Sequence, residues 1–224
     1  IMDNLTFLQH FQALQYPIMG DKLVSLENAS ITYNKQNRSS PWNHALLLRN
    51  INSDQLQTIE KTMQELDRTP AVYFEGAEKF EPSKNLLLEH NYEKAWDDSW
   101  MFHSGENIDS SRFACVTKVA NEQDLAVFLD TLDHCFVKDD PQNPYGELGD
   151  DKAIDERIWH DHQANDRIEY FIVWHEGNPV AVSALTNFAR VGYISNVASL
   201  MSVRGQGFGK IATMYCVQKS IANG

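Results

Sequence analysis

Apolar residues in the first half of the chain alternate between helical and strand-like spacing. An amphipathic helix near the start is predicted by apolar residues every three or four positions, at Leu5, Leu8, Phe11 and Leu14. The apolar runs at 23–33 and 44–48 predict strands. Asn52 or Ser53 then caps a helix with an inward face of Leu56, Ile59, Met63 and Leu66. Residues 71–74 predict a further strand, 83–90 a short helix, and the segment up to Phe102 a strand-like stretch.

The second half shows the same alternation in a different order. A strand is predicted over 113–119, and the pair Asn121 and Asp124 resembles a capping box. The helix behind it would bury Leu125, Phe128, Leu129, Leu132 and Phe136. An acidic loop at 138–151 and a helix around Ile154 and Ile158 follow. Three strands come next, over 168–174, 179–185 and 192–200, then a glycine-rich turn and a final helix with Phe208, Ile211, Tyr215 and Ile221 on one face.

Length and composition are those of a folded protein with two domains. The chain has 224 residues, of which 42% are apolar and 22% charged. The polar segment 103–111, HSGENIDSS, is the best linker candidate. We therefore expect one domain over residues 1–110 and a second over 111–224.

Charge and cysteine content indicate which kinds of partner and which cellular compartment to expect. A formal net charge of −12 argues against a basic face for nucleic acid. No apolar run approaches the ~18 residues of a membrane helix, and the N-terminus lacks the features of a secretory signal. Three widely spaced cysteines predict reduced thiols in a cytoplasmic protein. His160 and His162 would point about 200° apart on a helix, so we expect no metal site.

The stretch 197–210, VASLMSVRGQGFGK, places three glycines and two cations directly after a predicted strand, which is typical of phosphate binding. A nucleotide-binding P-loop would need glycine in place of Arg204 and a hydroxyl residue in place of Ile211. A dinucleotide fingerprint would need glycine in place of Lys210 and an acidic residue about 20 positions further on, past Gly224. Both patterns fail.

The remaining pattern is R-x-x-G-x-G, formed by Arg204, Gly207 and Gly209. Together with the element order of residues 113–224, it resembles the GNAT acetyltransferase superfamily. The resemblance implies an α/β (α+β) fold with a mixed, mostly antiparallel sheet flanked by helices. It also implies acetyl-CoA as cosubstrate. The physics agrees, because a helix N-terminus offers free N–H groups to phosphate and glycines leave room for it.

In that family the turn holds the pyrophosphate of acetyl-CoA, and the preceding strand contacts the thioester and the pantetheine arm. Carried over by position, the implied cofactor-binding residues are Val197, Ala198, Ser199, Arg204, Gly205, Gln206, Gly207, Phe208, Gly209 and Lys210. The implied activity is acetyl transfer to a primary amine of a small molecule or a peptide. Two alternatives stay open: a CoA-binding or regulatory module without turnover, and a structural protein whose turn binds nothing.

The implied reaction needs a base for the substrate ammonium, and strand 192–200 contains no carboxylate. The catalytic candidates are Glu169 on the first central strand and the backbone of Ser199, which would polarise the thioester. Water held by Tyr193, Ser195 or Asn196 is the alternative base. Tyr215 is in the wrong segment for the family's acid and is expected in the core.

The first half resembles a degenerate copy of the same fold, because strand, turn and helix follow one another over 43–61 without a glycine in the turn. An unrelated α+β domain is the alternative. The family continues beyond the cofactor helix, at whose end this chain stops. We therefore expect that the native protein continues with strands that this chain lacks, which leaves one edge of strand 193–200 open. The alternatives are that residues 71–74 or a second copy in a homodimer fill that edge.

Overall fold

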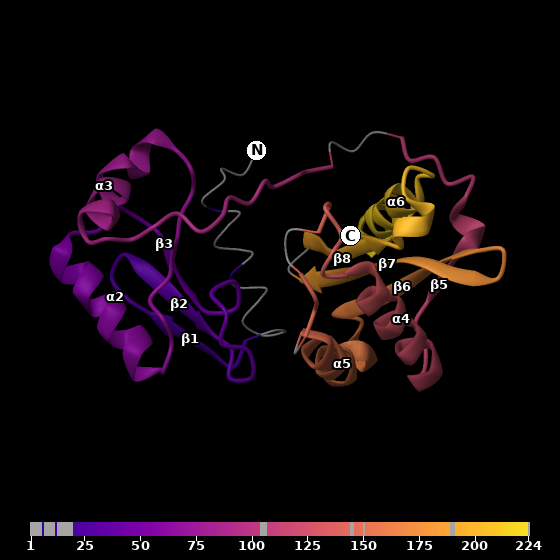
Figure 1. The fold of residues 1–224 in the computed structure, drawn as a ribbon, viewed down its shortest axis with the longest axis horizontal. Coiled ribbons are helices and arrows are strands. Elements are labelled where there is room, and N and C mark those ends of the chain that lie inside the picture. The colour runs from indigo at the N-terminus through magenta and orange to yellow at the C-terminus, as the bar shows by residue number, and fades with distance from the viewer. Residues whose placement is uncertain are drawn as a thin grey trace. The chain divides into compact units, whose positions relative to one another are not determined.

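The computed structural model describes Thr6, Gln12 and residues 20–103, 107–143, 146–149, 151–188 and 191–223. The chain divides into two compact units, residues 1–101 and 102–224 (Figure 1). The helix expected around Leu5 to Leu14 lies outside the described residues. No helix in the described ranges is long and apolar enough to cross a membrane.

The first unit is built on a four-stranded mixed sheet in the order β1-β2-β3-β4. Its strands are β1 (Lys22–Ser25), β2 (Ala29–Tyr33), β3 (His44–Leu47) and β4 (Val72–Tyr73). β1, β2 and β3 pair antiparallel, and β4 pairs parallel with β3. The apolar run 23–33 is thus two strands, because Leu26 turns the chain and donates its N–H to Ala29 at 2.9 Å.

Two helices complete this unit: α2 (Ser53–Glu65) and α3 (Glu81–Glu89), the latter preceded by the 3₁₀ turn η1 (Glu78–Phe80). The predicted cap of α2 is confirmed: the Asn52 side chain accepts from the Gln55 N–H at 3.0 Å, and the Gln55 side chain accepts from the Asn52 N–H. The predicted inward residues Leu56, Ile59 and Met63 are buried against the sheet. Burial of this apolar stripe is what fixes α2 on β2 and β3.

The strand-like stretch predicted up to Phe102 is wrong. Residues 93–103 form no strand in the described structure. Trp96 and Phe102 are exposed, and Trp100 donates its indole N–H to the Tyr73 hydroxyl at 3.2 Å. Asp97 and Asp98 lie in the middle of the segment, and aspartate is disfavoured in strands.

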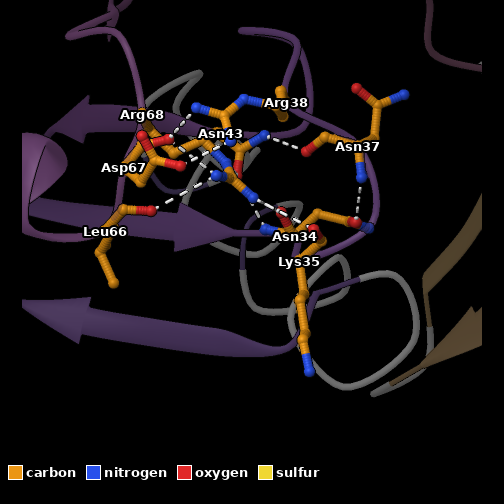
Figure 2. A network of polar contacts seen from close by, with 8 residues as sticks. All are labelled: Asn34, Lys35, Asn37, Arg38, Asn43, Leu66, Asp67 and Arg68. Atoms are coloured by element: carbon orange, nitrogen blue, oxygen red, sulfur yellow. Dashed lines mark hydrogen bonds and ion pairs between the residues drawn. The ribbon is translucent and has the colours of Figure 1, made fainter.

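A buried guanidinium ties the end of α2 to the loop between β2 and β3 (Figure 2). Arg68 is 7% exposed and has no carboxylate on it in the described network. Its N–H groups donate to Asn43 Oδ1 and to four backbone carbonyls, those of Asn34, Lys35, Leu66 and Asp67, at 2.7–3.3 Å. The guanidinium also lies 4.6 Å from the centre of the Tyr33 ring. Only the planar fork of arginine can reach all of these oxygens at once.

Arg68→Lys should therefore destabilise the first unit although the charge is kept. A lysine reaches at most three of these acceptors and leaves buried carbonyls unpaired, which costs about 2 kcal/mol or more. Equilibrium urea unfolding of the full chain measures this. Arg38→Lys is the matched control, because Arg38 is exposed in its pair with Asp67 and its replacement should change little. Equal effects of the two substitutions would contradict the role assigned to Arg68.

The second unit is built on a four-stranded antiparallel sheet in the order β5-β6-β7-β8. The strands are β5 (Val116–Lys118), β6 (Ile168–His175), β7 (Asn178–Phe188) and β8 (Val191–Ser199). The strand predicted from residue 113 starts later, because Phe113–Cys115 forms the 3₁₀ turn η2. In the described ranges β8 pairs with β7 alone, and no ladder joins it to β4.

Helices cover both faces of this sheet (Figure 1). On one face lie α4 (Glu122–Cys135) and α5 (Asp151–His162), where Phe128 of α4 stacks on Tyr170 of β6 with ring centres 4.2 Å apart. On the other lies α6 (Phe208–Asn223), which packs through Phe208, Ile211 and Cys216. The predicted cap of α4 is confirmed, since Asn121 Oδ1 accepts from the Asp124 N–H at 3.0 Å. The mixed, mostly antiparallel sheets flanked by helices confirm the predicted fold class.

Candidate cofactor site

The glycine-rich turn connects β8 to α6 at one end of the sheet. The short 3₁₀ turn η4 (Met201–Val203) follows β8, and α6 begins at Phe208. Gly205 and Gly207 have φ of +80° and +84°, a backbone conformation that side chains disfavour. A Cβ built at Gly205 or Gly209 would meet no atom within 4 Å. These glycines therefore leave open space in front of the α6 N-terminus, instead of letting protein segments pack closely.

Gly192, on β8, provides the contrast. A Cβ at this position would lie 2.0 Å from Ser220 Oγ and 2.5 Å from Ser220 Cβ, on α6. Gly192 has no positive φ in this structure. It is therefore a packing glycine that lets α6 approach the sheet.

A bulge in β8 precedes the turn. Val182 faces Ala198 and Ala184 faces Ser195, so Asn196 and Val197 both lie opposite the single residue Ser183. Asn196 takes up the distortion with φ of +50°. A bulge leaves backbone groups out of the ladder and re-aims those beside it. Of the predicted contact residues, Val197 lies in the bulge, and Ala198 and Ser199 follow it.

An open cavity of about 390 Å³ lies beside the bulge and the turn. It is lined by Cys135, Phe136, Gln142, Asn143, Val197, Ala198, Ser199, Arg204 and Gly205. The structure thus brings predicted strand and turn residues together with the end of α4 and the loop after it.

Arg204 contacts the loop after α4. Its Nη2 lies 2.6 Å from Asp140 Oδ2, and its Nε and Nη1 donate to Ser199 O and Gln142 Oε1, each at 3.4 Å. The hydrogen bond from Arg204 lowers the pKa of Asp140 below its ordinary value. Arg204 was predicted on the pyrophosphate, but its guanidinium here joins the acidic loop to the turn.

Arg112 is a cation of this region that sequence reasoning missed. It donates to the Gln206 carbonyl at 3.2 Å, and its guanidinium lies 5.1 Å from the centre of the Phe208 ring. Its Nη1 would be 3.6 Å from a Cβ at Gly207. Lys210, on the first turn of α6, is exposed. Arg112 is separated from the turn by more than ninety positions, so no local pattern could reveal it.

Behind the bulge lies a buried carboxylate that the sequence analysis also passed over. Asp155 of α5 is 6% exposed and accepts from Asn196 Nδ2 at 3.0 Å. The Tyr170 hydroxyl donates to the Asp155 backbone carbonyl at 2.9 Å. Burial raises the pKa of Asp155 to about 7, against the opposing hydrogen bonds.

Glu169, the predicted base, lies elsewhere on the sheet. It is buried, with Lys118 Nζ 2.9 Å from Oε1 and Asn187 Nδ2 donating to Oε2 at 3.2 Å. It is not among the residues that line the cavity. Tyr215 packs edge-on against Phe113 and Phe171, as expected of a core residue.

The cysteines near the site are not activated. Cys135 lines the cavity, and burial raises the pKa of its thiol to about 12. Burial likewise raises the pKa of Cys216 to about 12. A neutral thiol is a poor nucleophile, so the chemistry of the cavity does not favour an acyl-cysteine intermediate.

Comparison with known proteins finds a family similar to part of the second unit. Residues 129–224 match the model of the acetyltransferase (GNAT) family, whereas no curated protein matches the chain. A GCN5-related N-acetyltransferase from Kribbella flavida is similar in fold, with TM-score 0.58, 16% identity, and coverage of 95% of this chain and 80% of that one. A functionally unknown conserved protein from Staphylococcus epidermidis is similar as well, with TM-score 0.59, 14% identity, and coverage of 91% and 81%. At these identities the likeness concerns the fold, and it spans both units.

The two kinds of glycine should respond differently to alanine. Gly192→Ala should lower the free energy of unfolding by about 1–3 kcal/mol, because the new methyl group overpacks the contact with Ser220. Gly209→Ala should leave stability unchanged or slightly raised, because it adds a helix former in open space. Thermal unfolding of both variants is the measurement. A destabilised Gly209→Ala protein would mean that packing, not an open cradle, explains this glycine.

Proposed function

Because residues 129–224 match the model of the acetyltransferase (GNAT) family, we propose that the chain is an acetyl-CoA-dependent N-acetyltransferase. The observation that carries the proposal is the open glycine turn at the α6 N-terminus, placed directly after the β8 bulge and beside the cavity. Free N–H groups at a helix start, without Cβ atoms in front of them, suit a pyrophosphate.

The chain's own groups fit this cosubstrate along its length. The backbone of residues 204–210 would hold the pyrophosphate, with Arg112 and Lys210 as neighbouring cations. Residues 197–199 line the cavity on the way from the turn to the bulge, where the pantetheine arm and thioester would lie. Bound acetyl-CoA supplies the activated acyl group.

The chemistry left to the protein is to polarise the thioester and to position the amine. Backbone N–H groups of residues 197–199, which lie at and directly after the bulge, would stabilise negative charge on the thioester oxygen. A neutral amine would then attack directly, since the Cys135 thiol is protonated at ordinary pH. Glu169 as base stays a prediction. It is paired with Lys118 and is not among the described residues that line the cavity, so it would have to release Lys118 before it could accept a proton.

The acceptor that we propose is a primary amine of a small molecule or peptide. The net charge of −12 favours cationic acceptors. The loop after α4 contributes the uncharged polar residues Gln142 and Asn143 to one wall of the cavity. We assign cofactor binding to the second domain, proposed as residues 111–224, and none to residues 1–110. The side-chain cap on α2 supports this division, because it already occupies the helix start that a phosphate would use. Three cysteines without a disulfide support a cytoplasmic setting.

A CoA-binding module without turnover is the second candidate. One observation favours it: no carboxylate is among the described residues that line the cavity. Binding and turnover must therefore be measured separately.

Gly209→Ala should weaken acetyl-CoA binding while the fold stays intact. The methyl group occupies the space proposed for phosphate and displaces it from the helix N–H groups, a loss of about tenfold or more in affinity. Isothermal titration calorimetry measures it. Gly76→Ala is the matched control, because Gly76 also has open space around it but lies in the first unit. Unchanged affinity in Gly209→Ala would remove the turn from the cofactor site.

Wild-type protein should release free CoA thiol from acetyl-CoA when a suitable primary amine is present. A panel of small polyamines, amino sugars and peptides, read with a thiol reagent, would identify the acceptor class. Binding of acetyl-CoA without thiol release by any amine would favour the module without turnover. Absence of acetyl-CoA binding would contradict both proposed functions.

A further inference from the structure

The buried contact between α5 and the β8 bulge is not explained by the fold alone. Asp155 and Asn196 are 41 positions apart, and the Asn196 amide donates to the Asp155 carboxylate at 3.0 Å. Asp155 is 6% exposed, and burial of an ionisable group without a cation is costly. A neutral side chain would serve packing better, so the carboxylate calls for another reason.

Asn196 is also the strained residue of the bulge. Its φ of +50° is left-handed, which is unfavourable for a residue with a Cβ and persists only where surrounding contacts hold it. The side-chain tether to Asp155 is such a contact. Asn196 directly precedes Val197, the first residue of the strand segment that lines the cavity.

We propose that Asp155 is a positioning residue for acetyl transfer: through Asn196 it holds the β8 bulge in the shape that presents the N–H groups of residues 197–199 to the thioester. This rests on the proposed function. Asp155 touches neither cosubstrate nor acceptor in this role. It acts by fixing one side chain, and thereby the direction of the backbone beyond it.

The remaining contacts of Asp155 keep the carboxylate in place. Tyr170 donates to its backbone carbonyl at 2.9 Å and lies 3.4 Å from its Oδ1. Burial raises the pKa of Tyr170, so its hydroxyl stays a donor throughout the working range. Phe128 stacks on the Tyr170 ring and fixes it in turn.

Ionisation of Asp155 gives the proposal a distinctive signature. The charged and titratable groups that act on Asp155 are Asp151 on its own helix and Tyr170 on β6, while Asn196 is its neutral donor on β8. With a pKa of about 7, the carboxylate is ionised above neutrality and protonated below it. A carboxylate accepts a stronger hydrogen bond from Asn196 than a protonated acid does. The bulge should therefore be held more tightly as pH rises through 7.

Stability should respond in the opposite direction. The pKa of Asp155 is raised in the folded protein, so its contribution to stability is complete below the ordinary carboxyl pKa and is lost as pH rises through about 7. A merely structural role would make function follow stability. The positioning role predicts instead that transfer improves while the fold weakens.

The test compares wild type with Asp155→Asn and Asn196→Gly between pH 6 and 8.5. Asp155→Asn keeps size and an acceptor oxygen but cannot ionise. Asn196→Gly adopts the left-handed backbone freely but has no tether. Both should lower kcat about tenfold at pH 8, with a much smaller change in acetyl-CoA affinity, because the glycine turn is untouched. The rise of wild-type kcat near pH 7 should disappear in Asp155→Asn with the same amine.

Thermal unfolding of each variant shows whether the fold survives, and Asn196→Gly decides the matter should Asp155→Asn unfold. Hydrogen exchange at residues 196–199, measured without cosubstrate, is the second readout. It should be faster in both variants than in wild type at pH 8, after correction for intrinsic rates. The proposal would be overturned if both variants had the same kcat, the same pH profile and the same hydrogen-exchange rates as wild type. A wild type that binds no acetyl-CoA would overturn the proposed function instead, and the exchange data would still judge the tether.

Discussion

Two residues of β8, Asn196 and Val197, lie opposite the single residue Ser183 of β7, and the candidate site depends on this bulge. The bulge takes Asn196 and Val197 out of one-to-one pairing, and the ladder resumes at Ala198 and Ser199. Ser183 itself is fully buried and also anchors α6, because its hydroxyl donates to the Ala212 carbonyl at 3.3 Å and accepts from the Cys216 thiol at 3.2 Å. The same position therefore fixes both the bulge and the helix whose N-terminus completes the site.

The two faces of the sheet contribute different parts of the candidate site. On the α6 face, Gly192 lets the helix approach the strand closely, and the glycines at the other end of the helix keep space open. On the α4 and α5 face, Asp155 contacts the bulge through its hydrogen bond with Asn196, and the stacked rings of Tyr170 and Phe128 pack on the same face. The site is thus held from both sides of one sheet, while the Arg204–Asp140 pair closes its rim.

In both units a strand is followed by a turn and a helix, β3 and α2 in the first and β8 and α6 in the second, but the start of the helix differs. In the first unit, Asn52 and Gln55 satisfy the N–H groups of α2 with their own side chains. In the second, Gly205 and Gly209 leave open space around the start of α6. The buried Arg68 guanidinium likewise has a structural role in the first unit, because it donates to backbone carbonyls.

Local sequence determined the elements and the turn. Apolar periodicity located α2, α4 and β6 to β8, and glycine spacing located the turn between β8 and α6, because these depend on neighbouring residues and on φ/ψ preferences. It failed where tertiary burial decides, as in the segment up to Phe102, which has strand-like residues but no sheet to join. The place of Arg112 beside the turn, the Arg204–Asp140 pair and the Asp155–Asn196 tether were decided only by the tertiary structure. Each joins residues far apart in the chain, and a one-dimensional pattern carries no information on which distant side chains a packed sheet will bring within hydrogen-bonding distance.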